Sequence, residues 1–288
     1  MRIGVVGHRG YRGLPEVLRG LSDLAPSLSF TLGFEEELLE FAPGAAPLGS
    51  LDDLDLMLTL GGDGTMLRAA RLLAGRQVPM LGINLGRLGF LTCCGPEELE
   101  ASMHRLAAGD FRAEPRMAIE ATGTAAGDLA YRRRALNDVV LHKGGYARVV
   151  RLEVAVNGES VASFGADGLV VATPTGSTAY NLSCGGPVLV PTVESIILTP
   201  ISPHTLALRP LVLPPTAEVT VRQFAHTDEL LVTVDGQVGW SLSGDNLLRV
   251  RRAEHPALFV RFTDSHFFRR LRTKLGWGGL AERDEKEC

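Results

Sequence analysis

A buried strand that runs straight into a glycine-rich turn is the sequence feature that most constrains how this chain folds. The predicted strand Asp55–Leu60 is followed at once by Gly61-Gly62-Asp63-Gly64-Thr65. The rest of the first hundred residues alternates in the same way, with strands expected at Arg2–Val6, Leu28–Gly33 and Val78–Ile83 and helices at Leu14–Leu24, Glu35–Phe41, Met66–Ala74 and Pro96–Ala107. Strands that alternate with helices predict a parallel sheet covered on both faces.

After about Gly109 the chain becomes rich in β-type segments separated by turn residues. We expect strands at Arg116–Thr122, Tyr131–His142, Val149–Val156, Ser160–Phe164, Leu169–Ala172, Leu208–Leu213, Glu218–Phe224, Glu229–Val234 and Leu247–Arg251. The Asn157-Gly158 pair predicts a two-residue hairpin turn. One helix is expected around Ser177–Ser183, and the amphipathic, basic stretch Ser265–Leu275 predicts a closing helix. The predicted class is therefore α/β plus β, with an α/β domain over residues 1–109, a β-rich domain over 110–262, and a C-terminal helix and tail over 263–288.

Composition and charge exclude several classes of function. The chain of 288 residues carries 29 basic and 33 acidic side chains, and this net charge of −4 argues against a general nucleic-acid binder. No stretch approaches roughly 18 consecutive apolar residues, and the N-terminus lacks a signal-peptide pattern. We therefore expect a cytoplasmic protein without nucleic-acid or membrane partners. Its four cysteines show no zinc spacing and are expected to be reduced thiols.

The turn around Asp63 is the first candidate site. Backbone N–H groups of a glycine-rich turn, with a helix N-terminus behind them, attract phosphate. A carboxylate in such a loop repels that ligand unless it takes part in the chemistry or holds a metal ion, and accepting a proton from a hydroxyl nucleophile would give Asp63 a chemical role. The alternative is a plain strand-to-helix turn in which Asp63 is a cap.

Two further segments carry polar groups suited to a nucleotide. Six hydroxyl side chains fall within the eleven residues 173–183, shortly after Asp167, and such a run can contact ribose and phosphate oxygens. Their alternative role is capping and turn formation. Asn137-Asp138 lies in an apolar segment, where an Asn amide can pair with adenine and an Asp can accept from ribose hydroxyls. The alternative there is a turn or strand-end pair. Asp235-Gly236 is a weaker candidate, read as a hairpin turn with Gln237 beside it.

Taken in order, these motifs resemble the NAD kinase family. Its hallmarks stand at Gly61–Thr65, Asn137-Asp138 and Thr173–Tyr180, with supporting matches at 82–91, 185–187, 203–205, 209–214 and 268–277. The resemblance covers the chain from about residue 55 to residue 277. Two positions depart from the family pattern, because Asp138 stands where relatives have Glu, and Gly165 stands where relatives often have a basic residue.

The resemblance implies both the architecture and the reaction. It implies a Rossmann-like N-terminal domain, a β-sandwich-like C-terminal domain, a C-terminal helix that returns to the first domain, and a homodimer or homotetramer. It implies transfer of the γ-phosphate of ATP to the 2′-hydroxyl of the adenosine ribose of NAD, giving NADP and ADP. ATP would bring Mg²⁺ or another divalent cation, held mainly by ATP and water rather than by a protein metal site.

By the same similarity, Asp63 is the general base and a set of residues binds the two substrates. The implied binding residues are Gly62, Gly64, Thr65, Arg68, Phe90, Asn137, Asp138, Arg148, Asp167, Thr175, Thr178, Ala179, Tyr180, Asn181, Leu182, Ser183 and Gln237. Arg68, Arg148 and Gln237 are the lesser candidates. Two other functions stay open, a lipid kinase with a similar glycine-rich loop and a dinucleotide sensor without turnover. Phosphate transfer to lipids would indicate the first, and tight NAD binding without turnover would indicate the second.

Overall fold

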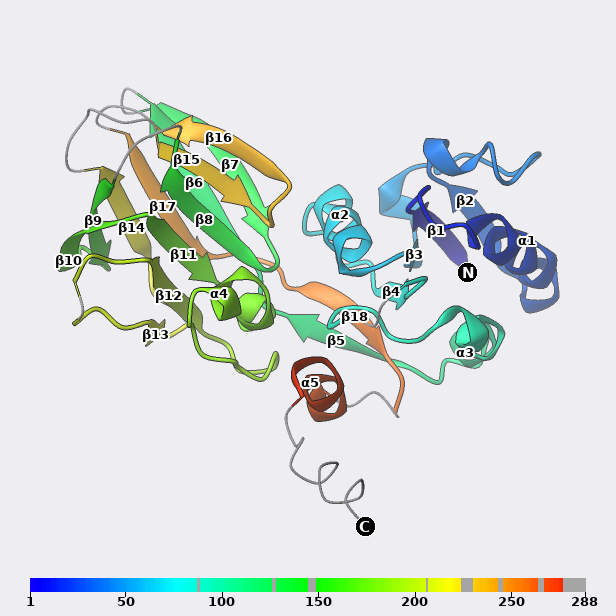
Figure 1. Ribbon diagram of the computed structural model, residues 1–288. Helices are drawn as coiled ribbons and strands as arrows, with labels where there is room; N and C mark the ends of the chain where they lie inside the picture. The colour runs from blue at the N-terminus through cyan, green and yellow to red at the C-terminus, as the bar shows by residue number, and fades with distance from the viewer. Residues whose placement is uncertain are drawn as a thin grey trace, which may run out of the picture. The chain divides into compact units, whose positions relative to one another are not determined.

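The structure is a computed structural model of the whole chain, and it describes residues 1–86, 89–125, 128–144, 149–205, 207–223, 230–242, 246–263 and 267–276. Its contacts divide the chain into two compact units (Figure 1). Unit 1 holds Met1–Leu73, Val78–Glu114 and the described residues from Leu258 onward, and unit 2 holds Ala74–Gln77 and Pro115–Ala257. The domain limits expected at residues 109 and 262 stay a prediction. No helix of the described residues is long and apolar enough to cross a membrane.

Unit 1 is built on a six-stranded sheet of the predicted parallel kind. Its strands, in spatial order, are β2 (Thr31–Phe34), β1 (Arg2–Gly7), β3 (Leu56–Leu60), β4 (Met80–Ile83), β18 (Ala257–Arg261) and β5 (Arg112–Arg116). Four neighbouring pairs are parallel, namely β1 with β2, β1 with β3, β3 with β4, and β4 with β18. β18 was not expected from sequence, and it brings the end of the chain back to the first sheet.

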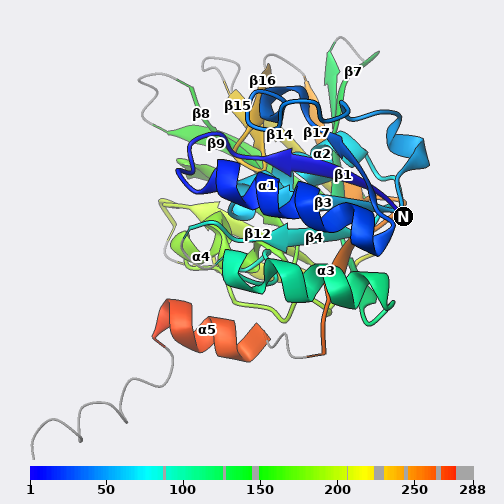
Figure 2. The same ribbon diagram turned by 90° about the vertical axis from the view of Figure 1, so that its right-hand side faces the viewer.

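Helices cover both faces of this sheet. Figure 2 shows α1 (Leu14–Leu24) and α3 (Leu99–Ala107) lying side by side over β1, β3 and β4. α1 begins and ends where the sequence predicts, because Leu14, Leu18 and Leu21 recur at helical spacing and are fully buried. α2 (Asp63–Leu73) packs from the other face, where Met66 meets Thr59 of β3. Shorter 3₁₀ turns cover Ala25–Leu28, Glu36–Leu38, Leu51–Asp53 and Pro96–Glu98.

Unit 2 is a sandwich of two antiparallel sheets, as the family resemblance implied. One sheet has the order β10 (Glu159–Ala166), β9 (Val150–Val156), β14 (Val219–Gln223), β17 (Leu247–Arg252), β6 (Ile119–Ala125) and β7 (Asp128–Ala135). The other has the order β13 (Leu211–Leu213), β12 (Ile196–Ile201), β11 (Gly168–Ala172), β8 (Asp138–Lys143), β15 (Leu230–Val234) and β16 (Val238–Leu242). The predicted hairpin at Asn157-Gly158 joins β9 to β10, with positive φ angles of 53° and 84°.

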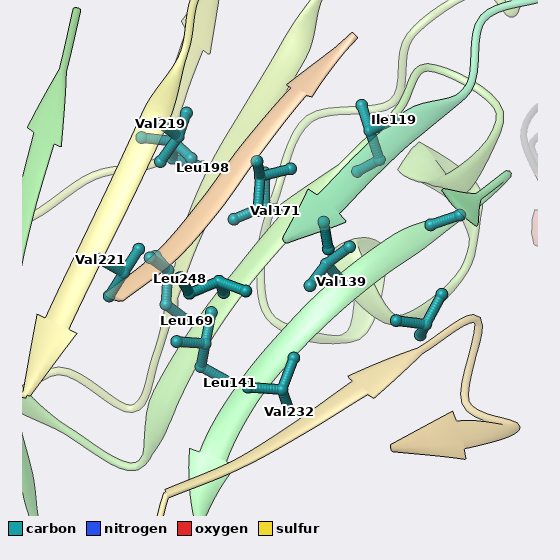
Figure 3. Close-up of a cluster of buried hydrophobic side chains, with 14 of the residues drawn as sticks. Ile119, Val139, Leu141, Leu169, Val171, Leu198, Val219, Val221, Val232 and Leu248 are labelled. Carbon is teal, nitrogen blue, oxygen red and sulfur yellow. The ribbon is translucent and has the colours of Figure 1, made fainter. Parts of the chain in front are cut away.

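The two sheets of unit 2 share one apolar core. Figure 3 shows Val139 and Leu141 of β8 in the same cluster as Val221 of β14 and Leu248 of β17. Side chains alternate along a strand, so Val140 points to the opposite face of β8, into a second small cluster. The same alternation places Asp138 and His142 on that second face. The core therefore fixes which side of β8 is available for a polar site.

One predicted strand is wrong. The segment Tyr131–His142 was expected to be a single strand, but β7 ends at Ala135 and β8 begins at Asp138. The backbone turns at Leu136 and Asn137, and the side chain of Asp235 accepts hydrogen bonds from their amides. Asn137-Asp138 is therefore a strand-end pair, which is the alternative that the sequence left open.

The remaining helices are α4 (Tyr180–Ser183), which follows a 3₁₀ turn at Gly176–Thr178, and α5 (Phe267–Leu275). α5 belongs to unit 1, where Arg270 binds backbone carbonyls of Phe90 and Cys93. A C-terminal helix that returns to the first unit was expected and is confirmed.

Candidate active site

The glycine-rich turn of unit 1 connects β3 to α2. Gly61 donates its N–H to the carbonyl of Ile83 at 2.9 Å, and the carbonyl of Gly62 accepts from Thr65 N at 3.0 Å. A side chain at position 61 would collide with that of Thr65, so this close turn requires glycine. Gly64 is exposed, and Thr65 is buried beneath it. The turn thus presents its glycine backbone at the helix N-terminus, where a phosphate is favoured.

The carboxylate of Asp63 is held from a distant part of the chain. Its Oδ2 accepts from Phe90 N at 2.8 Å and its Oδ1 from Leu91 N at 2.9 Å. A side chain on Gly89 would run into this carboxylate, so the backbone of 89–91 fits closely around it. Asp63 is half-buried and is the first residue of α2. The side chain is therefore fixed in orientation, and its negative charge suits the positive end of the helix.

Two other predicted residues of unit 1 have well-defined contacts. Arg68 forms an ion pair of 2.6 Å with Glu35 and donates to the carbonyl of Gly7 at 2.5 Å, so it ties α2 to the ends of β1 and β2. Burial raises the pKa of Glu35, and the charge of Arg68 opposes that effect. Sequence reasoning missed Glu35, although it directly follows a strand that ends at the same edge of the sheet. The ring of Phe90 contacts α5, 6.5 Å from the ring of Phe267 and 4.7 Å from the ammonium of Lys274.

Unit 2 contains a pocket of about 580 Å³ beside β8, within the range of small-molecule sites. Its lining combines acidic, basic and apolar groups: Asn137, Asp138, Val140, His142, Lys143, Asp167, Ala179, Tyr180, Ile201, Thr233, Asp235 and Gly236. Five of these, Asn137, Asp138, Asp167, Ala179 and Tyr180, were predicted site residues. The structure thus brings together three segments that lie far apart in the sequence.

The side chain of Asp235 holds the backbone of the strand-end pair Asn137-Asp138. The carboxylate of Asp235 accepts from the amides of Leu136, Asn137 and Asp138, at 2.7 to 3.2 Å. Burial, and secondly the charge of Asp235, raise the pKa of Asp138 to about 7. The sequence identified Asp235 only as a turn residue, and the hairpin signal did not reveal contacts to residues 97 to 99 positions away.

Two buried polar atoms of predicted site residues have no hydrogen-bond partner among the described residues. They are Oδ1 of Asn137 and Oγ1 of Thr175. Because nearly all buried polar atoms in proteins are paired, an unpaired one needs an explanation such as a ligand or a water. Gly176 packs so closely on the carbonyl of Asn137 that a side chain there would collide with it.

The cation of this pocket comes from an unexpected position. Lys143 forms an ion pair of 2.7 Å with Asp167, and both side chains are about one-third exposed. Gly165, one of the two departures from the family pattern, lies in β10 opposite Arg151. Lys143 and His142, at the end of β8, were not selected from sequence, although the predicted strand Tyr131–His142 ends at His142 and Lys143 follows it directly.

Part of the hydroxyl-rich segment stabilises the fold, in line with the alternative of turn formation, whereas neither Gly176–Thr178 nor α4 has a side-chain cap hydrogen bond. Thr173 donates to the carbonyl of Leu136 at 2.5 Å, and the hydroxyl of Ser177 accepts from Leu189 N at 3.0 Å. Asn181 is fully buried, donates to the carbonyls of Ser177 and Pro187, and accepts from Thr199 at 2.6 Å. These contacts fold residues 173–189 over the second face of the sheet.

The other residues of the predicted set that the structure describes lie outside the pocket lining. Thr178 and Leu182 are half-buried, Ser183 is exposed on α4, and Gln237 is exposed at the β15–β16 turn. Arg148 lies outside the described residues. A substrate role for these residues, and for the others of the predicted set, stays a prediction.

Together, the parallel sheet with a glycine-rich loop at a helix N-terminus and the sandwich with a polar pocket define a nucleotide-dependent phosphotransferase. The protein-family model of the ATP-NAD kinase N-terminal domain matches residues 49–111 of this chain. The family model of the ATP-NAD kinase C-terminal domain matches residues 136–262. The NAD kinase of Gemmatimonas aurantiaca is 59% identical over 286 residues, with 99% of each chain covered. That of Geobacter metallireducens is 47% identical over 227 residues, covering 79% of this chain and 80% of the relative. The chain belongs to the NAD kinase family.

Solved structures agree with this assignment. The yeast NADH kinase complexed with NADH has a TM-score of 0.85 and 25% identity, over 96% of this chain and 88% of the other. An NAD kinase from Archaeoglobus fulgidus in complex with ATP has a TM-score of 0.73 and 28% identity, over 96% and 98%. The predicted family, fold class and enzyme class are confirmed.

Proposed function

We propose that this NAD kinase transfers the γ-phosphate of ATP to the 2′-hydroxyl of the adenosine ribose of NAD, with Asp63 as the general base. The observation that carries the proposal is the fixed carboxylate of Asp63 at the N-terminus of α2, held by the amides of Phe90 and Leu91. A carboxylate oxygen that accepts one hydrogen bond still has a lone pair for a second, so Asp63 can take a hydroxyl proton.

In the proposed reaction, the proton of the 2′-hydroxyl moves to Asp63 while the ribose oxygen forms a bond to the γ-phosphorus. The bond between that phosphorus and the bridging oxygen breaks, and ADP leaves. Phosphoryl transfer of this kind depends mainly on alignment and on neutralisation of the phosphate charge. The backbone of Gly62 and Gly64 and the positive end of α2 would stabilise the phosphates of ATP.

The pocket of unit 2 is the proposed site for the adenosine half of NAD. Asn137 offers an unpaired amide oxygen, and amides recognise adenine through such groups. Asp138 and Asp167 can accept hydrogen bonds from ribose hydroxyls, and Lys143 offers a cation for a phosphate. Asp138 is one methylene shorter than the Glu of relatives, so a water can complete its reach.

ATP is proposed to bring a divalent cation such as Mg²⁺. The described residues contain no group of three or more His, Cys, Asp or Glu side chains arranged to hold a metal ion. The residues present therefore fit a cation whose ligands come mainly from ATP and water. When bound, the cation would reduce the negative charge of the phosphates.

The test is NADP formation by the purified protein with NAD, ATP and Mg²⁺, detected with an NADP-specific dehydrogenase. We expect Asp63→Asn to keep the fold and NAD binding but to lose about 10²- to 10⁴-fold in turnover. Asp53→Asn is the matched control in the same unit, because Asp53 is 61% exposed at the surface. Near-normal turnover in Asp63→Asn would contradict the general-base role. NAD binding by the unmodified protein without turnover would instead favour the sensor function.

We also propose that the protein is a homodimer or homotetramer. The edge strand β13 carries exposed Leu211 and Val212, and apolar edge strands invite pairing with another chain. Light scattering coupled to size exclusion measures the mass. A monomer at micromolar concentration would contradict this proposal. The cytoplasmic location also stays a prediction, which cell fractionation tests.

A further inference from the structure

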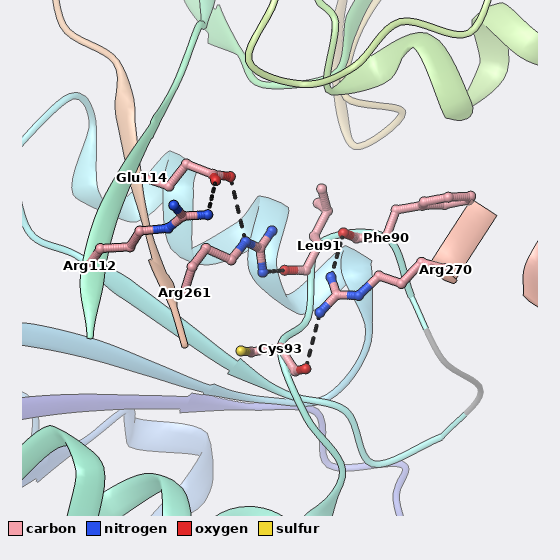
Figure 4. A network of polar contacts seen from close by, with 7 residues as sticks. All are labelled: Phe90, Leu91, Cys93, Arg112, Glu114, Arg261 and Arg270. Atoms are coloured by element: carbon pink, nitrogen blue, oxygen red, sulfur yellow. Dashed lines mark hydrogen bonds and ion pairs between the residues drawn. The ribbon is translucent and has the colours of Figure 1, made fainter. Parts of the chain in front are cut away.

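Residues 90–93 of unit 1 connect two sets of charged side chains through their backbone. On one side, the amides of Phe90 and Leu91 donate to Asp63. On the other side, Arg270 of α5 donates to the carbonyls of Phe90 and Cys93, both at 3.0 Å (Figure 4). Arg261 of β18 donates to the carbonyl of Leu91 at 3.2 Å. The segment is therefore held between a carboxylate and two guanidinium groups.

One peptide group lies directly between Arg270 and Asp63. The carbonyl of Phe90 and the N–H of Leu91 belong to the same peptide, so a single planar unit accepts from Arg270 and donates to Asp63. Hydrogen bonds in such a chain polarise one another, because a cation on the carbonyl makes the N–H a stronger donor. The positive charge of Arg270 is in this way transmitted to Oδ1 of Asp63 without direct contact.

The burial of the charged Arg270 side chain carries a cost in free energy. The side chain is only 9% exposed, and this burial lowers its pKa. Burying a charge is unfavourable unless hydrogen bonds and an opposite charge compensate. The neighbouring Arg269 and Arg272 of the same helix are exposed. Phe267 and Lys274 of α5 also contact the ring of Phe90, so the helix packs on this segment with the face that carries Arg270.

We propose that Arg270 is a positioning residue for phosphoryl transfer, which fixes and polarises the 90–91 peptide so that Asp63 is held in its reactive orientation. Arg261 supports the same segment from β18. This proposal rests on the proposed role of Asp63 as the general base. It assigns a function to the C-terminal helix, which would complete the active site from 180 residues away.

The first test compares Arg270→Gln with Arg272→Gln, an exposed arginine of the same helix. A misplaced catalytic group costs up to about 10²-fold in rate, so we expect kcat to fall about 10- to 100-fold in Arg270→Gln. The KM for NAD should stay within about twofold, since the pocket of unit 2 is unchanged. Arg272→Gln should keep kcat. An unchanged kcat in Arg270→Gln, or a raised KM with a normal kcat, would overturn the proposal.

The second test is a double-mutant cycle with Asp63→Asn. If Arg270 acts through Asp63, then Arg270→Gln should cause almost no further loss in the Asp63→Asn background. The same fractional loss in both backgrounds would show that Arg270 acts independently, and would overturn the positioning role while leaving the general base intact. Near-normal turnover in Asp63→Asn alone would overturn the proposed function first, and the positioning role with it.

A conservative variant guards against simple misfolding. Lys keeps the charge but cannot match the two-pronged geometry with which a guanidinium reaches two carbonyls. Arg270→Lys should therefore fold, with a melting temperature close to that of the unmodified protein, and should have a kcat between those of the unmodified protein and Arg270→Gln. A kcat of Arg270→Lys no higher than that of Arg270→Gln, at an unchanged melting temperature, would overturn the transmitted-charge argument.

Discussion

Asp63 in unit 1 and Asp235 in unit 2 use the same structural device in opposite electrostatic surroundings. Each carboxylate accepts hydrogen bonds from backbone amides of a distant segment, from Phe90 and Leu91 in one case and from residues 136–138 in the other. Behind the first segment lie the guanidinium groups of Arg261 and Arg270. The second segment itself carries another carboxylate, that of the buried Asp138.

The difference indicates what each carboxylate is for. The cations behind the 90–93 segment fix the peptides that hold Asp63 in one orientation, which suits a group that must accept a proton. Burial and, secondly, the charge of Asp235 raise the pKa of Asp138, so the charge of Asp235 has an electrostatic cost. Its three amide contacts make the turn between β7 and β8 possible. We therefore expect Asp63 to matter chiefly for turnover and Asp235 chiefly for stability.

The largest effect should come from Asp235→Ala. Removal of this acceptor leaves up to three amides unpaired, two of them on the buried residues Leu136 and Asp138. An unsatisfied buried donor costs about 1–3 kcal/mol, so we expect the free energy of unfolding to fall by roughly 2–3 kcal/mol. Urea denaturation followed by tryptophan fluorescence measures this change.

The comparison fails if Asp63→Asn is just as destabilising as Asp235→Ala. Asp63 is half-buried, and an Asn side chain still accepts one of the two amide hydrogen bonds. We expect its loss of stability to stay below about 1 kcal/mol. Equal losses would mean that the two carboxylates have the same structural role.

These two residues also show where sequence reasoning succeeds and where it stops. The turn at Asp63 was found because strand, glycines and helix follow one another locally, and α1 was found from its leucine spacing. The contacts of Asp235 and Arg270 span 97 to 180 residues, and periodicity carries no information on such pairs.

Sequence reasoning found only part of the pocket of unit 2, because local patterns reveal motifs but not contacts between distant segments. Asn137, Asp138 and Asp167 belong to motifs that can be recognised locally, whereas Lys143 enters the pocket because β8 and β11 are neighbours in the sheet. The prediction of a single strand over Tyr131–His142 was wrong, because a tertiary contact from Asp235 stabilises the turn between β7 and β8. The sheet register and the long-range hydrogen bonds are properties of the folded chain that local patterns do not encode.

A change of one pH unit should have a smaller effect on stability, through Asp138. Its pKa in the folded protein is about 7, against about 3.9 in an unfolded chain. Between these values the folded state binds more protons than the unfolded state, so stability falls as pH rises from about 4 to 7 and then stays level. The slope is at most about 1.4 kcal/mol per pH unit.

Asp138→Asn should remove this contribution, because an amide does not titrate. Urea denaturation of both proteins between pH 5 and pH 7.5 measures it, and the variant should lose less stability over that range. This result sharpens the comparison, since it reports the cost of burying the Asp138 carboxylate and, secondly, of placing it beside Asp235. Parallel stability curves for the two proteins would show that Asp138 does not titrate in this window.

The smallest effect on turnover should come from the side chain of Cys93, because the 90–93 segment is held through its backbone. Arg270 binds the carbonyl of Cys93, which Cys93→Ser retains, so we expect turnover to stay within about twofold. The thiol nevertheless reports on the charges around the segment. A hydrogen bond from the Cys94 thiol, and then the charges of Arg261 and Arg270, lower the pKa of Cys93 against the effect of burial.

Burial instead raises the pKa of Cys184 in unit 2. Since the thiolate is the reactive form, iodoacetamide at pH 7 should label Cys93 before Cys184, as peptide mass spectrometry can measure. Labelling of Cys93 should also slow in Arg270→Gln, because one of the two cations near the thiol is gone. Two outcomes would contradict this prediction: labelling of Cys184 before Cys93, or labelling of Cys93 at the same rate in the unmodified protein and in Arg270→Gln. Either would show that Arg261 and Arg270 do not act on the 90–93 segment as the contrast with Asp235 requires.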